Sequence, residues 1–354
     1  MKKISLSTVL GLLLIVGTAC GEEGTEETEG TADVETEEAN ADESDSNGEA
    51  AEGDTYEIKL AENQPDDYPT TIGDKAFAEM VDERSDGRIQ VEVFSGGQLG
   101  DERSVLEQVQ IGSIEMARTN ASPLTEFSED IGVLSMPYLF ENDEAMWDVL
   151  LSEVGDDLLD SLNDASMQGL AFYDSGSRSL YNAERPINGP DDVDGLQIRV
   201  QESDMMVDLI EALGGSPTTM AFEEVYSGLE TGVVDGAENN FPSYYSTNHY
   251  EVAEYYTLNA HSTVPEVLVM AEDVWNQMSE EDQQIVREAA QDSIEVQREA
   301  WDELVEESRE TIEENGNQIT EVDDYTDWRE AVEPLYEKYG TEYQDWIDRI
   351  EEAQ

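Results

Sequence analysis

Strand and helix patterns alternate through the first third of this chain, and that alternation constrains the fold more than any other feature. Residues 56–60 (YEIKL) and 89–94 (IQVEVF) alternate polar and apolar side chains, which predicts two strands. Residues 73–85 and 105–111 repeat apolar side chains at helical spacing, and a third strand is expected at 114–118. The resulting order of elements is typical of an α/β fold with a parallel sheet.

A second run of the same pattern follows. Strands are predicted at 196–201 (LQIRVQ) and 265–270 (PEVLVM), with short helices at 204–213 and 222–229 between them. Two α/β lobes joined by two or more crossings of the chain are the simplest architecture that accommodates both runs.

A long helix is predicted after the last of these strands. Ser279 and Asp282 resemble a capping box, and nothing interrupts the helical pattern before Gly316. About 37 residues would extend roughly 55 Å, which is enough to bridge two lobes. The remaining residues predict two terminal helices, whose aromatic stripe, including Trp328 and Trp346, is expected to be core.

These patterns divide the chain into four parts. We expect an export signal at 1–20 and a disordered acidic linker at 21–55. Lobe I is expected at 56–177 plus 265–304, and lobe II at 178–264 plus 305–354 together with the C-terminal helices.

The first twenty residues resemble a bacterial lipoprotein signal. Lys2 and Lys3 precede the apolar stretch 9–16, which is too short to span a membrane stably. Small residues follow, and then Cys20, the only cysteine of the chain. We expect lipidation of Cys20 and attachment to the outer face of the membrane. The alternative is an ordinary signal peptide cleaved beside an incidental cysteine, and the mature protein is exported in either case.

Acidic residues dominate the rest of the chain. The linker contains 15 acidic residues and no basic one, and residues 56–354 still carry a net charge of about −56. A surface this acidic repels a phosphate backbone, so nucleic-acid binding is excluded. It also suggests a host that lives at high salt, where screening weakens the self-repulsion of the fold.

Enzyme motifs are absent from the sequence. It has no nucleophile elbow, no phosphate-binding loop and no dinucleotide fingerprint. His249 and His261 are isolated, which is more typical of packed residues than of catalysts. A glycosidase needs only two carboxylic residues, and this sequence has many. A cell-surface carbohydrate hydrolase is therefore an alternative. No cofactor and no metal site are expected.

The scarce arginines carry more information than the abundant acids. Arg199 lies within the apolar strand LQIRV, and Arg178 follows the predicted strand 169–172. A guanidinium presented by a strand can bind a carboxylate through two parallel hydrogen bonds. The alternative for either arginine is an ion pair with an acidic residue of the protein itself.

Residues 196–241 resemble the solute-binding proteins of tripartite ATP-independent periplasmic (TRAP) transporters. The segments LQIRVQ and EALGGSPTTMAFEEVYSGLETGVVDGAENN carry this resemblance, and SGGQLGDERSVLEQVQIGSIEM and MPYLF extend it upstream. The resemblance implies a two-lobed fold like that of periplasmic binding proteins, with a long helix that spans the hinge. It also implies that the protein is not an enzyme and that it delivers a carboxylate ligand to a membrane permease.

The resemblance also implies the binding residues. Arg199 matches the position that pairs with the ligand carboxylate, and Arg178 matches a second arginine. The other implied ligand contacts are Asn63, Glu102, Asn120, Phe222, Asn239, Asn240 and Tyr244.

The doubled Asn239-Asn240 and the following PSYY resemble members that bind sugar acids such as glucuronate or galacturonate. A dicarboxylate would require a second basic site, for which only Arg178 and Arg118 are candidates. We therefore expect a uronate. Other sugar acids, C4-dicarboxylates and keto acids remain alternatives, as does a sensing role for the same site.

Overall fold

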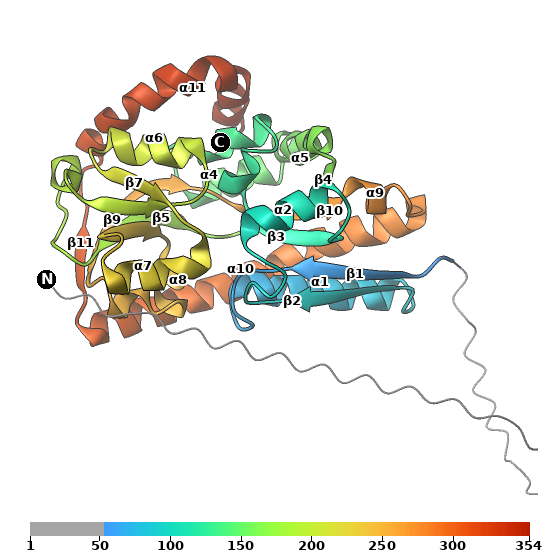
Figure 1. Ribbon diagram of the computed structural model, residues 1–354. Helices are drawn as coiled ribbons and strands as arrows, with labels where there is room; N and C mark the ends of the chain where they lie inside the picture. Colours follow the sequence, from blue (N-terminus) through green and yellow to red (C-terminus); the bar gives the residue numbers. More distant parts are fainter. Residues whose placement is uncertain (1–52) are drawn as a thin grey trace, which may run out of the picture. The chain divides into compact units, whose positions relative to one another are not determined.

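The computed structural model describes residues 53–354, whose helices and strands are shown in Figure 1. The predicted export signal, Cys20 and nearly all of the acidic linker lie outside the described residues. Within the described part, the strands form two separate sheets, and helices cover both of them. The expected α/β fold with two lobes is confirmed.

The first sheet has the strand order β2-β1-β3-β10-β4. Strand β1 is parallel to β2 and β3, as expected, whereas β10 is antiparallel to β3 and β4. The expected parallel arrangement thus holds for the first three strands, and the antiparallel β10 makes the whole sheet mixed. The reason is that β10 enters directly from the other sheet, so it starts at the edge where β3 ends. The strands span Tyr56–Ala61 (β1), Ile89–Phe94 (β2), Met116–Asn120 (β3), Met167–Tyr173 (β4) and Glu266–Ala271 (β10).

The second sheet has the order β11-β9-β5-β8-β6-β7. Strand β6 is parallel to β7 and β8, while β5 is antiparallel to β8 and β9. The strands span Ser177–Asn182 (β5), Gln197–Val200 (β6), Ser216–Thr219 (β7), Gly236–Asn239 (β8), Tyr255–Thr263 (β9) and Gln318–Glu321 (β11).

The helices surround these sheets in the described part of the chain. Helix α1 starts at Pro69, four residues before the predicted start, because proline suits the first turn of a helix. The α-helices span Pro69–Arg84 (α1), Glu102–Gln110 (α2), Ala121–Leu124 (α3), Asp143–Leu150 (α4), Glu153–Asp160 (α5), Asp204–Ala212 (α6), Val225–Thr231 (α7), Phe241–Ser246 (α8), Glu272–Trp275 (α9), Glu280–Asn315 (α10) and Thr326–Ala353 (α11). Short 3-10 helices include Asp130–Ser135 (η1) and Phe222–Glu224 (η4).

The long helix α10 bridges the two halves of this unit, as predicted. The Ser279 hydroxyl accepts a hydrogen bond from the Asp282 backbone N–H, and Gly316 ends the helix with a φ of +92°. The helix packs against α1 and β4 on one side and against α8 on the other (Figure 1).

The C-terminal segment differs from the prediction. In place of two terminal helices it forms β11, which extends the second sheet beside β9, and one helix, α11. Although Pro334 lies inside α11, the helix continues through it. Trp328 and Tyr343 on its aromatic face are buried, as expected, whereas Trp346 is only partly buried and donates from its indole N–H to Asp130. Helix α11 packs against α6 and also against α4, α5 and η1, so it contacts elements from both halves.

Two short segments connect the sheets in addition to α10. Residues 174–176 lead from β4 to β5, and residues 264–265 lead from β9 to β10. The buried Gln297 side chain of α10 holds the first segment through both the N–H and the carbonyl of Asp174, each at 2.8 Å. The Ser175 hydroxyl donates to the Val264 carbonyl at 2.6 Å and so ties the two segments together. These contacts identify the hinge between the lobes.

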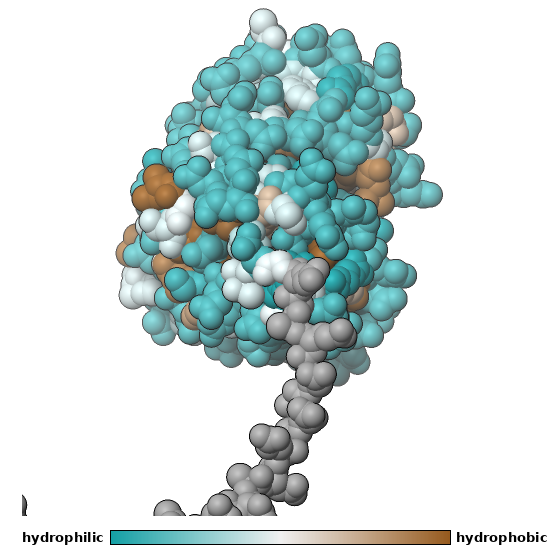
Figure 2. Space-filling view, turned by 90° about the vertical axis from the view of Figure 1, so that its right-hand side faces the viewer, coloured by the Kyte–Doolittle hydropathy of each residue, from teal (hydrophilic) through white to brown (hydrophobic). Residues whose placement is uncertain are grey.

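The surface shown in Figure 2 is mostly hydrophilic, with small separate groups of hydrophobic residues. Among the described residues, the large apolar side chains that stand exposed are Ile111, Leu151 and Val233. No helix in residues 53–354 combines the length and apolarity that a membrane crossing needs.

Candidate ligand-binding site

A group of adjoining cavities lies where the two sheets face each other across the hinge. The central cavity is lined from β1, β3, β6 and β8, at or just beyond the carboxyl ends of these strands, which is where α/β folds commonly bind ligands. Two smaller spaces adjoin it and share Glu102 with it. The central cavity is lined by Asn63, Gln64, Glu102, Arg118, Asn120, Arg178, Arg199, Gln201, Phe222, Asn239, Ser243 and Glu266.

Seven of the nine predicted ligand contacts line this cavity, including both arginines. The structure therefore brings together residues that lie as much as 176 positions apart in the sequence. Asn240 and Tyr244 are not among the lining residues. Asn240 caps helix α8 by accepting from the Ser243 N–H, and the fully buried Tyr244 hydroxyl bonds to Ala253 and Asn317. Both side chains already have structural partners, which explains their position away from the cavity.

Arg199 is the arginine with unused hydrogen-bonding capacity. It lies on β6, is 4% exposed, and donates from Nε to the Met220 carbonyl at 2.8 Å. Among the described residues, no acceptor lies within hydrogen-bonding distance of its two terminal nitrogens, and it forms no ion pair. Burial lowers the pKa of Arg199 from its usual value, although the guanidinium remains charged at any physiological pH. A buried cation without a counter-ion is costly, so an anionic partner is expected.

Arg178 is in the opposite state. Its Nε donates to a Glu238 carboxylate oxygen at 2.5 Å, and one terminal nitrogen reaches the other oxygen at 2.8 Å. The remaining nitrogen donates to Asn239 at 3.1 Å. For Arg178 the alternative of an internal ion pair is therefore right. Burial opposes ionisation of Glu238, but the charge and hydrogen bonds of Arg178, together with the adjacent His261 ring, lower its pKa to about 2.

The two histidines are packed residues, as their isolation in the sequence suggests. His249 is buried and bonds to the Tyr181 hydroxyl at 2.8 Å. Burial, and then the charge of Arg199, lower the pKa of His249 to about 3, so this ring is neutral at physiological pH. His261 is also buried, with Nε2 at 3.4 Å from Glu238.

Glu102 lies at the start of α2 and lines all three spaces. One carboxylate oxygen accepts from the Thr119 hydroxyl and from the Asn120 backbone N–H, both at 2.9 Å. Burial and the nearby Glu266 raise the pKa of Glu102 to about 7. Its second oxygen has no hydrogen bond among the described residues, so Glu102 can accept one from a ligand hydroxyl.

Sequence reasoning missed four of the lining residues and left a fifth, Arg118, undecided. Gln201 could have been found, because it follows Arg199 at the two-residue spacing that places side chains on one face of a strand. Glu266 had a signal as well, since it is the one acid in the apolar strand PEVLVM. Gln64 lies in a connection and Ser243 in the short helix α8, and neither had such a pattern.

Within residues 53–354, a cavity between two α/β lobes that is lined by a buried arginine without an ion-pair partner has the character of a binding site for a small anion. Residues 60–342 match the family described as "Bacterial extracellular solute-binding protein, family 7". The chain belongs to this family, and it is an extracytoplasmic solute-binding protein of the TRAP type, not an enzyme. This membership favours binding over the hydrolase alternative.

Several similar proteins are known. A solute-binding protein of Chromohalobacter salexigens is 39% identical over 293 residues, which cover 82% of this chain and 87% of the relative. A TRAP periplasmic solute-binding protein of a Bradyrhizobium species, in complex with α/β-D-galacturonate, is 41% identical, with a TM-score of 0.82 over 84% of this chain and 99% of that one. Another from Chromohalobacter salexigens, with bound D-glucuronate, is 38% identical, with a TM-score of 0.82 over 84% of this chain and 100% of that one.

Proposed function

We propose that this protein captures a hexuronate, such as D-glucuronate or D-galacturonate, and delivers it to a TRAP permease. The proposal rests on the hydrogen bonding of Arg199. Its buried guanidinium has two terminal nitrogens that donate no hydrogen bond to any of the described residues. A ligand carboxylate would accept from both nitrogens and supply the missing negative charge. The galacturonate- and glucuronate-bound relatives support this choice of ligand.

The polar groups around the cavity suit a hydroxylated acid. Glu102 offers a carboxylate oxygen, while the amides of Asn63 and Gln201 offer donors and acceptors. Asn120 is already held, since its amide donates to Val264 and Glu266 at 3.0 Å each. Phe222 is half-buried and presents the apolar surface against which a sugar ring can pack. We propose that Glu102, Asn63, Gln201, Phe222 and Asn239 orient the ring while Arg199 holds the acid, and that the paired Arg178 and the held Asn120 keep the cavity wall in place.

We further propose that the lobes close on the ligand by bending at the hinge. The segments 174–176 and 264–265 would absorb the change in backbone angles, and α10 would stay attached to both sides. For this motion we assign 56–177 plus 265–304 to one lobe and 178–264 plus 305–354 to the other.

Titration calorimetry of the purified protein tests the proposed ligand. D-Glucuronate or D-galacturonate should bind, whereas D-glucose and D-galactose should not. Each neutral sugar differs from its uronate only in having a hydroxymethyl group in place of the carboxylate. Binding of a C4-dicarboxylate such as succinate in preference to every uronate would contradict the proposal.

A membrane anchor through Cys20 is a separate proposal that rests on the sequence. Lys2, Lys3 and the apolar stretch 9–16 precede this single cysteine at the spacing of a lipoprotein signal. Mass spectrometry of the mature N-terminus should find Cys20 as the first residue, carrying lipid. A mature chain that starts elsewhere without lipid would contradict the anchor.

A further inference from the structure

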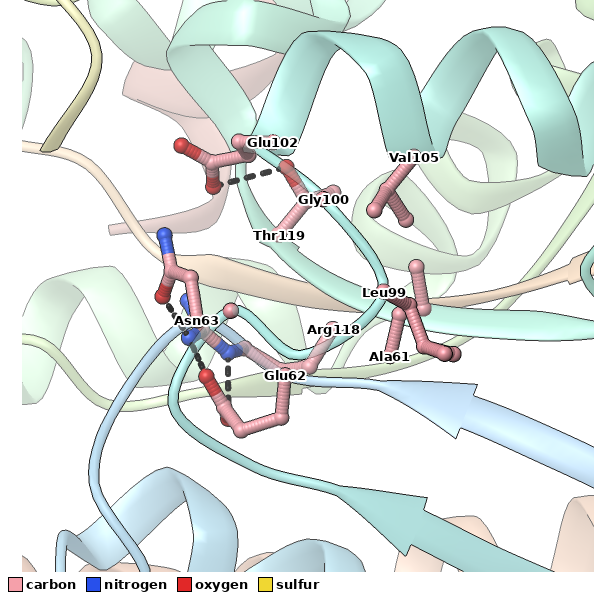
Figure 3. A pocket seen from close by; sticks show the side chains of 11 residues that line it. Ala61, Glu62, Asn63, Leu99, Gly100, Glu102, Val105, Arg118 and Thr119 are labelled. Carbon is pink, nitrogen blue, oxygen red and sulfur yellow. Dashed lines mark hydrogen bonds and ion pairs between the residues drawn. The ribbon is translucent and has the colours of Figure 1, made fainter. Parts of the chain in front are cut away.

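The third arginine of the cavity, Arg118, is paired with two acidic residues, Glu62 and Glu266, and is therefore not available to a ligand. The proposed function assigns no role to these two acids. Arg118 lies on β3, is 4% exposed, and lines both the central cavity and the space beside it. Its Nε donates to one Glu62 oxygen at 2.8 Å and a terminal nitrogen donates to the other (Figure 3). Its other terminal nitrogen donates to Glu266 at 2.5 Å. Every guanidinium nitrogen thus has a partner.

The two carboxylates are themselves held in place. Glu62 accepts from the Thr70 hydroxyl at 2.9 Å and from the Gln64 backbone N–H at 2.7 Å. Glu266 accepts from the Asn120 amide at 3.0 Å. Because other groups fix both acids, a ligand cannot displace them from Arg118 without leaving buried carboxylates unpaired, which is costly.

The charges of this cluster do not balance. Two carboxylates face one guanidinium, so Glu62, Arg118 and Glu266 together carry one excess negative charge. The field of Glu266 extends to its neighbours, since it contributes to the raised pKa of Glu102 and, after burial, to the raised pKa of Asp74. The wall formed by the first sheet is therefore negative, whereas Arg199 makes the opposite wall positive.

From this geometry we infer that Glu62 and Glu266 are specificity residues that reject a second ligand carboxylate. The inference rests on the proposed function, because it sets which sugar acids the Arg199 site accepts. A uronate presents its carboxylate to Arg199 and hydroxyls to the negative wall. An aldarate has a carboxylate at each end, so its second carboxylate would lie toward Glu266 in the central cavity and toward Glu62 in the adjoining space, where like charges repel.

The test compares D-gluconate with D-glucarate, two open-chain acids that differ in the group at carbon 6, a hydroxymethyl in one and a carboxylate in the other. Their affinities are measured by calorimetric competition at pH 7.5 on the wild type, Glu62→Gln, Glu266→Gln and the double variant. Glu57→Gln serves as the matched control, because it removes one charge from an exposed position on β1.

The wild type should bind D-glucarate at least about tenfold more weakly than D-gluconate. Glu62→Gln and Glu266→Gln should each raise the affinity for D-glucarate relative to D-gluconate, by about tenfold or more in the double variant, whereas Glu57→Gln should leave the ratio unchanged. Equal binding of both acids by the wild type would overturn the inference, and so would an unchanged ratio in variants that still bind a ligand. If a variant does not fold, the wild-type ratio still decides.

The proposed function is judged on a different result in the same series, the binding of D-glucuronate or D-galacturonate to the wild type. A wild type that binds a uronate but does not distinguish D-glucarate from D-gluconate contradicts the role of Glu62 and Glu266 alone. A wild type that binds no uronate contradicts the proposed function.

Discussion

The two sheets contribute arginines to the same cavity in opposite electrostatic states. Arg199, from the second sheet, makes one hydrogen bond to a backbone carbonyl and faces the cavity with two nitrogens unused among the described residues. Arg118, from the first sheet, is equally buried but is enclosed by Glu62, Glu266 and Asn63. A buried arginine on a strand is therefore available to a ligand only where the protein itself supplies no counter-ion.

The largest expected effect on ligand affinity comes from removing Arg199, the arginine that has no ion-pair partner among the described residues. Arg199→Ala should weaken uronate binding roughly 100-fold or more in titration calorimetry, because the ligand carboxylate loses the guanidinium with which it is proposed to pair. Arg84→Ala, which removes an exposed arginine on α1, is the matched control and should bind normally. If the Arg199→Ala variant binds a uronate with unchanged affinity, the ligand carboxylate does not pair with Arg199.

The paired arginine of the second sheet should affect stability more than recognition. Glu238→Gln should lower the free energy of unfolding by about 3 kcal/mol, because it leaves the buried Arg178 without a counter-charge. Since the folded pKa of Glu238 is about 2, its contribution is present above the unfolded pKa and is lost as the pH falls from about 4.5 toward 2.

Denaturant unfolding of the wild type and the Glu238 variant between pH 2 and pH 7 measures both effects. The gap between the two proteins should be widest near neutral pH and narrow as the pH falls. A gap that stays constant through this range would show that the Glu238 charge is not responsible.

Ligand affinity should depend on pH through Glu102. Its pKa of about 7 means that it is mostly protonated at pH 6 and mostly ionised at pH 8. An anionic ligand is repelled by the ionised form, so uronate affinity should rise by up to about tenfold as the pH falls from 8 to 6. Calorimetry across this range should find the dependence flattened in Glu102→Gln. A wild-type affinity that is constant from pH 6 to pH 8 would refute this role.

The smallest expected effect is that of salt on the unfolding temperature. Salt screens the charges on the surface, whereas it has little access to the buried ion pairs of the cavity. Thermal unfolding in 1 M NaCl should occur at least about 3 °C above that in 0.1 M NaCl, because salt reduces repulsion across an acidic surface. Sucrose at equal osmolality is the control for a general co-solvent effect. An unfolding temperature that does not rise with salt would argue against adaptation to high salt.

Much of the fold could be predicted because it follows from local patterns. The alternation in β1 and β2, the Ser279 cap and the terminating Gly316 are each visible within a few residues of sequence. Strand direction and the C-terminal segment could not be predicted in this way. The antiparallel β10 depends on where the chain crosses between lobes, and β11 forms because β9 offers an open edge.

The candidate site shows the same limit. Sequence and resemblance predicted both Arg178 and Arg199 as ligand contacts. Only the structure shows that Arg178 is paired within the protein, since Glu238 lies 60 residues from the arginine it neutralises. Asn240 and Tyr244 were expected as ligand contacts because their segment resembles that of sugar-acid-binding members, yet Asn240 caps a helix and Tyr244 lies in a buried aromatic cluster. Pairing between distant residues decides such cases, and no local pattern encodes it.

A crystal structure of the protein with bound D-glucuronate or D-galacturonate would show directly which arginine holds the ligand. We expect the ligand carboxylate at about 2.9 Å from both terminal nitrogens of Arg199, with hydroxyl groups toward Glu102 and with Arg118 still enclosed by Glu62 and Glu266. A carboxylate bound to Arg118, with its acids displaced and Arg199 left without a partner, would contradict this expectation.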